Sequence, residues 1–176
     1  GGSLNINTNS GQNGSTNGYG APTNEVGNWI TPLSINKDSE VYAGYSSVYN
    51  FGSAGWTKIS DTFEANIEVL ELDPINSDIM YVSLGQQLHK SVDHGVTFSQ
   101  IQDFPRSITS IEVNNDDNMI LYITTQGGIG NVYKSPDQGT NFTEITGTLP
   151  FVTKNILKHQ PFSPTNALYL GTSLGV

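Results

Sequence analysis

The chain has 176 residues, of which only 13% are charged, and 16 Asp and Glu against 7 Lys and Arg give a net charge of −9. Duplex nucleic acid and anionic membrane surfaces are bound mainly through Lys and Arg, so this balance argues against both as partners. The sequence contains no cysteine, which excludes disulfide bonds, thiolate metal sites and a cysteine nucleophile. No apolar run reaches the roughly 18 residues of a spanning helix, so we expect no membrane span.

The first 28 residues are rich in Gly, Asn and Ser, and two interpretations fit them. The first is a linker or disordered arm, which such a composition favours. The second is the end of a degenerate structural repeat, because Leu4 and Asn9 lie 84 residues before Leu88 and Asp93 of a clearer repeat. The sequence alone leaves both interpretations open.

A short strand-like element recurs four times from residue 40 onward. Each copy centres on a tyrosine, and successive tyrosines are 39, 41 and 47 residues apart: Tyr42, Tyr81, Tyr122 and Tyr169. A polar turn rich in Asp, Asn, Pro or Ser precedes each copy, at 34–38, 73–77, 114–118 and 163–166. Two landmarks that share one period indicate a repeat architecture.

The second repeat divides into four short strands. Runs at 67–72, 80–84, 88–91 and 97–101 are rich in β-branched or apolar residues and are bounded by turn formers. No window shows an apolar stripe of helical period with caps. We therefore predict an all-β fold. Four strands in about 42 residues are typical of one β-propeller blade, so the predicted architecture is a partial propeller of four-stranded antiparallel blades.

The link between the third and fourth strands carries a repeated aspartate motif. The first copy consists of Ser91, Asp93, Gly95, Thr97 and Phe98, and the second copy consists of Ser135, Asp137, Gly139 and Phe142. The motif resembles the Asp box of BNR, sialidase-like and sortilin-like propellers. Aspartate accepts hydrogen bonds from turn backbone, glycine permits a positive φ, and the aromatic ring buries area between blades. Both aspartates are therefore expected to be structural residues of Asp-box hairpins.

The repeats divide the chain into five segments. Residues 1–28 form the Gly/Asn/Ser-rich segment, 29–65 a blade with a degenerate box, 66–107 and 108–153 blades with Asp boxes, and 154–176 the start of a further blade. Propellers hold about four to eight blades. We therefore expect the remainder of a larger chain to be a partner of these blades.

The resemblance has limits that bear on function. Sialidases of this fold use three arginines, whereas Arg106 is the only arginine here, and sortilin-type domains carry cysteines that this chain lacks. The segments 27–32 and 42–45 resemble large secreted bacterial surface proteins that are exported by type IX secretion. This likeness implies a secreted or cell-surface location.

If the four strands of a blade are called A to D in chain order, their direction alternates along the chain. The A–B turns and the Asp turns, which join C to D, then lie at one end of the blade. The B–C loops and the D–A loops, which lead to the next blade, lie at the other end. Function is therefore expected on the second end, where a phenylalanine recurs in each D–A loop. The candidate ligand face consists of Asp61, Phe63, Glu64, Asp103, Phe104, Arg106 and Phe151. For the three phenylalanines two interpretations compete, namely plugs of the gaps between blades and an aromatic platform for a sugar or peptide.

The sequence favours a non-catalytic scaffold for display, adhesion, or glycan or protein binding. It contains no catalytic constellation, and we expect neither a cofactor nor a metal site. Asn114–Asn118 offers oxygen ligands for calcium, but its alignment with the other polar turns favours turn chemistry. Two alternatives stay open, which are a sialidase-like glycoside hydrolase with its active site largely outside this stretch and a structural secretion cargo without a small ligand.

Overall fold

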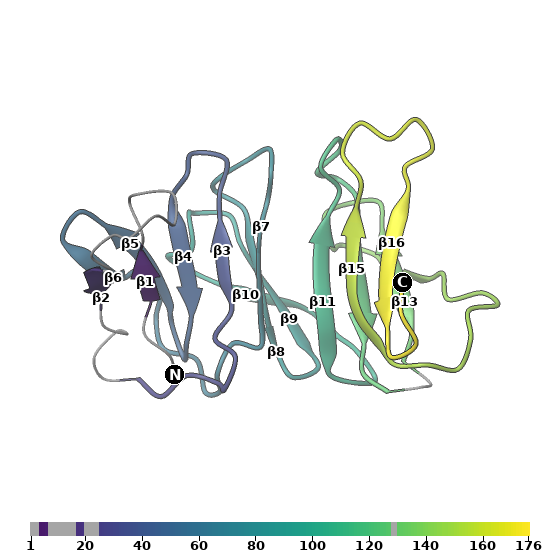
Figure 1. Cartoon of the computed structure of the whole chain (residues 1–176), viewed down its shortest axis with the longest axis horizontal. Helices are drawn as coiled ribbons and strands as arrows, with labels where there is room; N and C mark the ends of the chain where they lie inside the picture. Colours follow the sequence, from purple (N-terminus) through teal and green to yellow (C-terminus); the bar gives the residue numbers. More distant parts are fainter. Residues whose placement is uncertain (1–3, 7–16, 20–24, 128–129) are drawn as a thin grey trace.

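The computed structural model describes residues 4–6, 17–19, 25–127 and 130–176, and every regular element within them is a β-strand (Figure 1). This confirms the all-β prediction. No helix in the described part of the chain is long and apolar enough to cross a membrane. Residues 7–16 and 20–24 of the Gly/Asn/Ser-rich segment lie outside the described residues, so the two interpretations of that segment stay open.

Three four-stranded antiparallel sheets follow one another along the chain, each in the order of its sequence. The first consists of β3 (Leu33–Ile35), β4 (Val41–Gly44), β5 (Val48–Gly52) and β6 (Gly55–Lys58). The second consists of β7 (Val69–Leu72), β8 (Met80–Leu84), β9 (Gln87–Ser91) and β10 (Ser99–Asp103). The third consists of β11 (Ile108–Val113), β12 (Leu121–Thr125), β13 (Val132–Ser135) and β14 (Thr143–Glu144).

Two shorter sheets flank these three. One pairs β1 (Leu4–Ile6) with β2 (Asn17–Tyr19), and the other pairs β15 (Lys154–His159) with β16 (Leu168–Thr172). They lie at opposite ends of the row of sheets (Figure 1). The sheets stand side by side like consecutive blades, with β3, β7, β11 and β15 as the first strand of each.

The recurring tyrosine has the same register in every sheet. It lies on the second strand and pairs with one residue of the first strand, giving the pairs Tyr42–Ser34, Tyr81–Glu71, Tyr122–Glu112 and Tyr169–Lys158. The repeat found in the sequence is therefore a repeat of structure. It also makes Ser34, Glu71, Glu112 and Lys158 equivalent positions on successive first strands.

The core consists of apolar layers between neighbouring sheets. Tyr42 and Val48 of the first sheet pack against Leu70, Leu72 and Met80 of the second. A second layer joins the second and third sheets, and its buried members include Tyr81, Leu88, Ile111, Leu121 and Ile123. A third layer joins the third sheet to β15 and β16, and its buried members are Tyr122, Val132 and Leu157. Alternate residues of each strand supply these layers, because successive side chains of a strand point to opposite faces.

The strand boundaries differ from the sequence prediction at the Asp turn. The fourth strand of the second sheet was expected to begin at residue 97, but β10 begins at Ser99. Asp93 accepts two hydrogen bonds from Thr97, one from its backbone N–H and one from its hydroxyl. These bonds hold Thr97 in the turn, so regular pairing with β9 starts two residues later.

The contacts between loops place them at the two ends as expected. At the turn end, the His94 N–H donates to Asp78 O at 3.0 Å, which joins the Asp turn to the A–B turn of the same sheet. At the other end, Phe104 N–H donates to Gln86 O at 3.0 Å, which joins a D–A loop to a B–C loop.

Candidate binding groove

The two aspartate turns have nearly identical hydrogen bonding. Asp93 Oδ1 accepts from the Ser91 hydroxyl at 2.7 Å and from Thr97 N–H at 2.9 Å, while Oδ2 accepts from the Thr97 hydroxyl at 2.6 Å. The Thr97 hydroxyl, followed by the Thr97 N–H and the Ser91 hydroxyl, lowers the pKa of Asp93 to about 2. Gly95 has a φ of 82°, a conformation that glycine adopts without strain. The carboxylate of Asp93 is therefore fully engaged by its own turn.

Asn141 replaces the usual threonine in the second turn and makes the same pair of bonds. Its N–H donates to Asp137 Oδ1 at 2.8 Å, and its side-chain amide donates to Oδ2 at 2.7 Å. The Asn141 amide, then its backbone N–H and the Ser135 hydroxyl, lowers the pKa of Asp137. Gly139 has a φ of 91°. An amide thus substitutes for a hydroxyl without loss of a hydrogen bond.

Replacing Asp93 by alanine is expected to lower the thermal midpoint of unfolding, because the turn donors lose their acceptor. The pKa of Asp93 is lowered from 3.8 to about 2, so its contribution is fully present above pH 3.8 and is lost as the pH falls toward 2. Melting curves of Asp93→Ala and the wild type should therefore converge between these pH values. A midpoint equal to that of the wild type at pH 7 would contradict the turn assignment.

The phenylalanines of the predicted ligand face do not share one environment. Phe104 is 3% exposed and packs against Tyr133 and Phe142, with ring centroids 4.9 and 5.1 Å apart. Phe63 is half-buried and packs against Phe98 at 5.4 Å. Only Phe151, at 75% exposure, is open to solvent. Phe63 and Phe104 therefore pack in the gaps between neighbouring sheets, which favours the plug interpretation for these two, whereas a ligand role at this end of the molecule stays a prediction.

The polar members of the predicted ligand face are scattered in the structure. All four are exposed: Asp61 and Glu64 lie in the loop between β6 and β7, and Asp103 and Arg106 lie at the end of β10 and in the loop that follows it. Asp61 borders a small cavity of about 200 Å³ with Thr62 and Phe98, whereas the cavity lining includes none of the other three.

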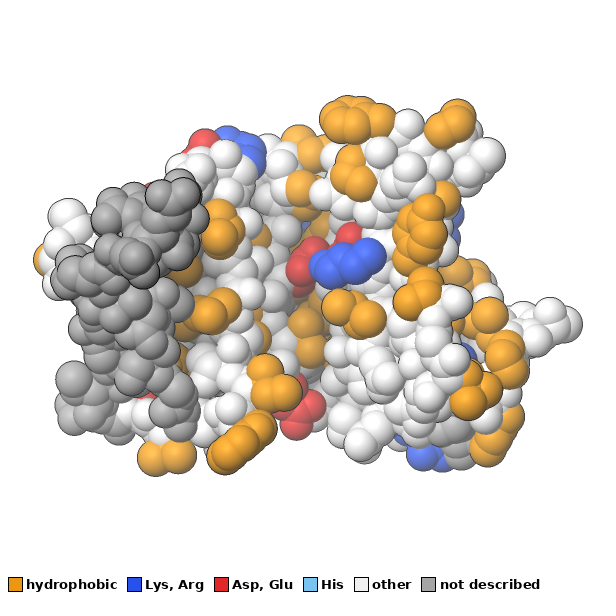
Figure 2. Space-filling view, in the orientation of Figure 1, with side chains coloured by type: hydrophobic (Ala, Val, Ile, Leu, Met, Phe, Trp, Pro, Cys, Tyr) orange, Lys and Arg blue, Asp and Glu red, His pale blue; other side chains and the backbone are white. Residues whose placement is uncertain are grey.

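A larger groove lies on the first strands of the sheets, which sequence reasoning had not considered. It has a volume of about 490 Å³ and receives side chains from β3, β7, β11 and β15 and from the turns that follow them. Acidic and basic side chains meet in the hollow between the two halves of the molecule (Figure 2). A second hollow of about 450 Å³ continues along the same strands toward the opposite end.

Two glutamates and a lysine, each from a different strand, form the polar centre of the groove. Lys158 Nζ lies 2.5 Å from Glu112 Oε2 and 3.8 Å from Glu71 Oε2. Glu112 is 2% exposed and also accepts a hydrogen bond from the His159 backbone N–H at 2.8 Å. The cluster therefore ties together the second sheet, the third sheet and the β15–β16 sheet.

Glu71 is the most perturbed acid of this cluster. Its pKa is raised to about 8, mainly by burial. The charge of Glu112 and a hydrogen bond between the Glu71 and Glu112 carboxyl groups raise this pKa further, whereas the charge of Lys158 lowers it. Burial alone would lower the pKa of Lys158, but Glu71 and Glu112 outweigh it and raise that pKa. At pH 7 Glu71 therefore holds its proton and Lys158 is charged.

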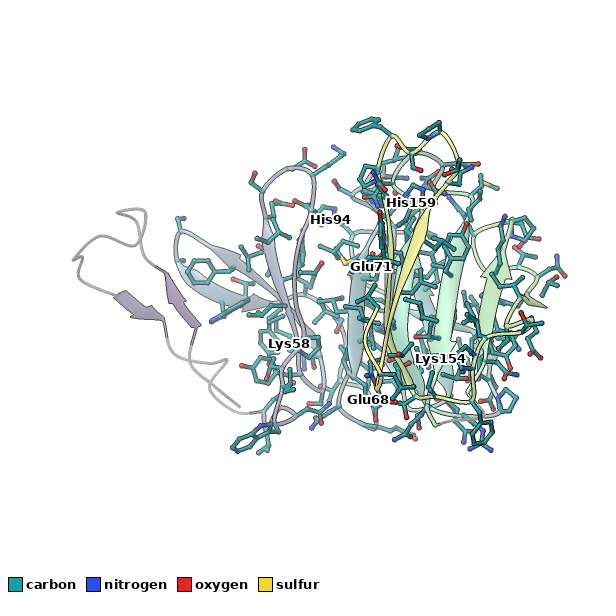
Figure 3. All side chains as sticks on the ribbon, turned by 45° about the vertical axis from the view of Figure 1, so that its right-hand side comes forward. Lys58, Glu68, Glu71, His94, Lys154 and His159 are labelled. Carbon is teal, nitrogen blue, oxygen red and sulfur yellow. The ribbon has the colours of Figure 1, made fainter. Side chains whose placement is uncertain are left out.

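His159 borders the groove with an unusual hydrogen-bond arrangement. It is 4% exposed, and its Nδ1 accepts from Asn115 N–H at 3.2 Å, so the ring proton is on Nε2. No described residue accepts a hydrogen bond from Nε2. Glu71 and His159, labelled in Figure 3, lie toward the turn end that also holds His94. The groove thus contains an acid, a cation and a free donor.

The sequence did contain a signal for this cluster. In each of these repeats a charged residue stands two positions before the polar residue that opens or precedes the A–B turn. The pairs are Glu71 and Asp73, Glu112 and Asn114, and Lys158 and Gln160. Each is the first-strand residue that pairs with the recurring tyrosine. A polar residue at the same place in each repeat indicates a shared surface, because repeats stack in register.

The calcium alternative at 114–118 is not supported by the geometry. The amide oxygen of Asn114 accepts hydrogen bonds from the backbone N–H groups of Asp116 and Asp117 at 2.8 and 3.0 Å. Asp73 makes the corresponding bonds to Ile75 and Asn76, both at 2.8 Å. No group of three or more His, Cys, Asp or Glu side chains that could hold a metal ion occurs among the described residues.

No protein-family model and no curated protein matches the sequence. Several solved structures do match it in shape. A GH74 enzyme of Niastella koreensis is 20% identical with a TM-score of 0.63, over 85% of this chain and 27% of that chain. The GH74 xyloglucanase of Xanthomonas campestris is 16% identical with a TM-score of 0.66, over 85% and 28%.

A chain of the nidogen/laminin complex is 17% identical with a TM-score of 0.69, over 90% of this chain and 61% of that chain. This chain spans just over a quarter of the length of the two GH74 proteins. Likeness at such low identity shows the fold and nothing finer. Together with the repeated four-stranded sheets, it shows that the chain has the β-propeller fold.

Proposed function

We propose that the chain is a non-catalytic binding scaffold of a secreted or cell-surface protein, and that its groove holds an uncharged glycan. The observation that carries this proposal is that charges in the groove cancel although the chain as a whole is acidic. Glu71 holds a proton at neutral pH because its pKa is raised to about 8. Glu112 is paired with the ammonium group of Lys158, and Asp73 and Lys37 add one charge of each sign to the lining, although Lys37 itself is paired with Asp38.

The other polar groups of the groove suit a polyhydroxylated ligand. Ser34, Asn36 and Asn115 line it with hydroxyl and amide groups, which both donate and accept hydrogen bonds. Convergent polar groups of this kind fix the orientation of a ligand in a pocket. A strongly charged ligand would lack a matching opposite charge, so an uncharged glycan fits better than a nucleic acid or a charged peptide.

The arrangement of the carboxyl groups favours binding over hydrolysis. Glycoside hydrolysis needs two carboxyl groups roughly 5–10 Å apart on either side of the scissile bond. Glu71 and Glu112 instead share a hydrogen bond, and Glu112 is bonded to Lys158. A second candidate is a glycoside hydrolase with catalytic groups elsewhere in a longer protein, which the GH74 likenesses favour. The cargo role without a ligand is the third.

A glycan array and calorimetric titrations with neutral oligosaccharides, including xyloglucan fragments, test the proposal. We expect Glu71→Gln to retain binding at pH 7, because glutamine mimics the protonated acid, and Glu71→Ala to weaken it. Asp61→Asn on the loop end serves as the control and should bind as the wild type does.

Binding to the wild type should weaken as the pH rises through about 8, where Glu71 ionises, and binding to Glu71→Gln should not. Release of reducing sugar would favour the hydrolase instead, and no binding to any glycan would favour the cargo role. The Asp-box assignment, the adhesion role and export by type IX secretion stay predictions. Detection of the protein on the cell surface, and its loss when that export route is disabled, would test the last of these.

A further inference from the structure

His159 is a polar residue at a position that the other repeats fill with aliphatic side chains. It is the last residue of β15 and pairs with Leu168, the residue before the recurring tyrosine. The residues in the same register on the earlier first strands are Ile35, Leu72 and Val113. An aliphatic side chain therefore suits this place in the fold, and packing alone does not account for the imidazole.

The imidazole ring is held in its orientation by the third sheet and the turn that follows β11. Its Nδ1 accepts a hydrogen bond from the Asn115 N–H at 3.2 Å, and the Asn115 side-chain amide donates to His159 O at 3.5 Å. The His159 backbone N–H donates to Glu112 Oε1 at 2.8 Å. Since Nδ1 is an acceptor, the ring proton lies on Nε2, and these bonds set the direction in which that proton points.

The Nε2–H group has no acceptor among the described residues, although His159 is only 4% exposed. A buried donor without an acceptor lowers the stability of a folded protein, so each such group needs an explanation. His159 lines the groove of about 490 Å³, as does its neighbour Lys158. An oxygen of a ligand in the groove is an acceptor that the described part of the chain does not supply.

We propose that His159 is a ligand-binding residue of the groove, and that its Nε2–H donates a hydrogen bond to one oxygen of the bound glycan. This inference rests on the function proposed above, a groove that holds an uncharged glycan. The hydroxyl, ring and glycosidic oxygens of a sugar can all accept such a bond. Because the ring is oriented before the ligand arrives, little side-chain freedom is lost on binding. A glycan without an oxygen at the matching position leaves the donor unpaired and binds more weakly.

Two substitutions separate a ligand role of His159 from a purely structural one. In His159→Asn the amide oxygen lies as many bonds from Cβ as Nδ1 does, so it can still accept from the Asn115 N–H, but no atom reaches the place of Nε2. In His159→Gln the amide nitrogen lies as many bonds from Cβ as Nε2 does. It can still donate to a ligand, but the bond from Asn115 is lost.

Calorimetric titrations of the wild type and both variants provide the first measurement. The probe is the neutral oligosaccharide that the wild type binds most tightly on the glycan array, from a set that includes cellotetraose, mannotetraose and chitotetraose. We expect His159→Asn to bind it roughly 3- to 10-fold more weakly, the loss that corresponds to one hydrogen bond, and His159→Gln to bind within about twofold of the wild type. Binding that His159→Asn keeps and His159→Gln loses would mean that the residue serves the fold alone, and would overturn the proposal.

Proton–nitrogen NMR of the wild type follows the ring itself and decides the case in which both variants bind weakly. The Nε2–H signal of His159 should shift when the oligosaccharide saturates the groove, whereas the ring signals of His89 and His94, which the groove lining does not include, should stay in place. An unmoved Nε2–H signal, or equal affinity of His159→Asn and the wild type, would overturn this inference and leave the glycan groove standing. No binding of the wild type to any oligosaccharide of the set would overturn the proposed function, and this inference with it.

Discussion

Phe104→Ala is expected to lower the free energy of unfolding by about 3–5 kcal/mol, the usual cost of removing a buried phenylalanine side chain. The ring is 3% exposed and touches Tyr133 and Phe142 across the interface between the second and third sheets. Its loss leaves a cavity that both sheets line, and the rigid strands on either side limit the collapse that would relieve the cost.

The chain provides a matched control for this prediction in the next D–A loop. Phe151 occupies the corresponding loop but is 75% exposed, so Phe151→Ala should change the free energy of unfolding by less than about 0.5 kcal/mol. Urea titrations followed by tryptophan fluorescence measure both variants. Equal costs for the two substitutions would mean that Phe104 does not plug the gap between the sheets.

Glu71→Gln is expected to make the protein more stable than the wild type at alkaline pH. The pKa of Glu71 is raised from 4.5 to about 8 in the folded protein, so folding favours the protonated acid. This contribution is fully present below pH 4.5 and is lost as the pH rises toward 8. Glutamine stays neutral throughout, so the variant avoids the loss, which is roughly 3–5 kcal/mol for a shift of this size.

The advantage of Glu71→Gln should therefore be small near pH 4.5 and largest at pH 9. Glu68→Gln is the control, since Glu68 is exposed close by in the sequence and should show no such trend. Denaturant melts at a series of pH values measure the effect. A difference between Glu71→Gln and the wild type that stays constant from pH 4.5 to 9 would mean that Glu71 is not held as an acid between the sheets.

The sequence was sufficient to predict the β-propeller fold. The period of the tyrosines is visible without structure because each tyrosine fills the same place in the layers between sheets, and Tyr42 and Tyr81 are indeed fully buried. The Asp turns are predictable for a local reason, because the donors and acceptors of each turn lie within a few residues of one another. The start of β10 was misplaced by two residues because Asp93 holds Thr97 in the turn.

The groove could not be found in the same way. Glu71, Glu112 and Lys158 come from three strands that lie about 40 residues apart, and only the stacking of sheets brings them together. The sequence pointed to the loops instead, because a phenylalanine recurs in each D–A loop at the end opposite the Asp turns. The phenylalanines show the same limit: Phe104 and Phe151 occupy corresponding loops, but Phe104 is buried against Tyr133 and Phe142 of the next sheet whereas Phe151 is exposed.

The central claim is that the stacking of propeller blades holds Glu71 as a protonated acid in the groove, beside Glu112 and Lys158. Carbon-detected NMR titration of the glutamate side chains measures this most directly, with Glu71→Gln used to assign the signal. The account predicts that the Glu71 carboxyl titrates near pH 8 and that its shift also reports the ionisation of Lys158. A Glu71 midpoint near 4.5, the value of a solvated glutamate, would contradict it.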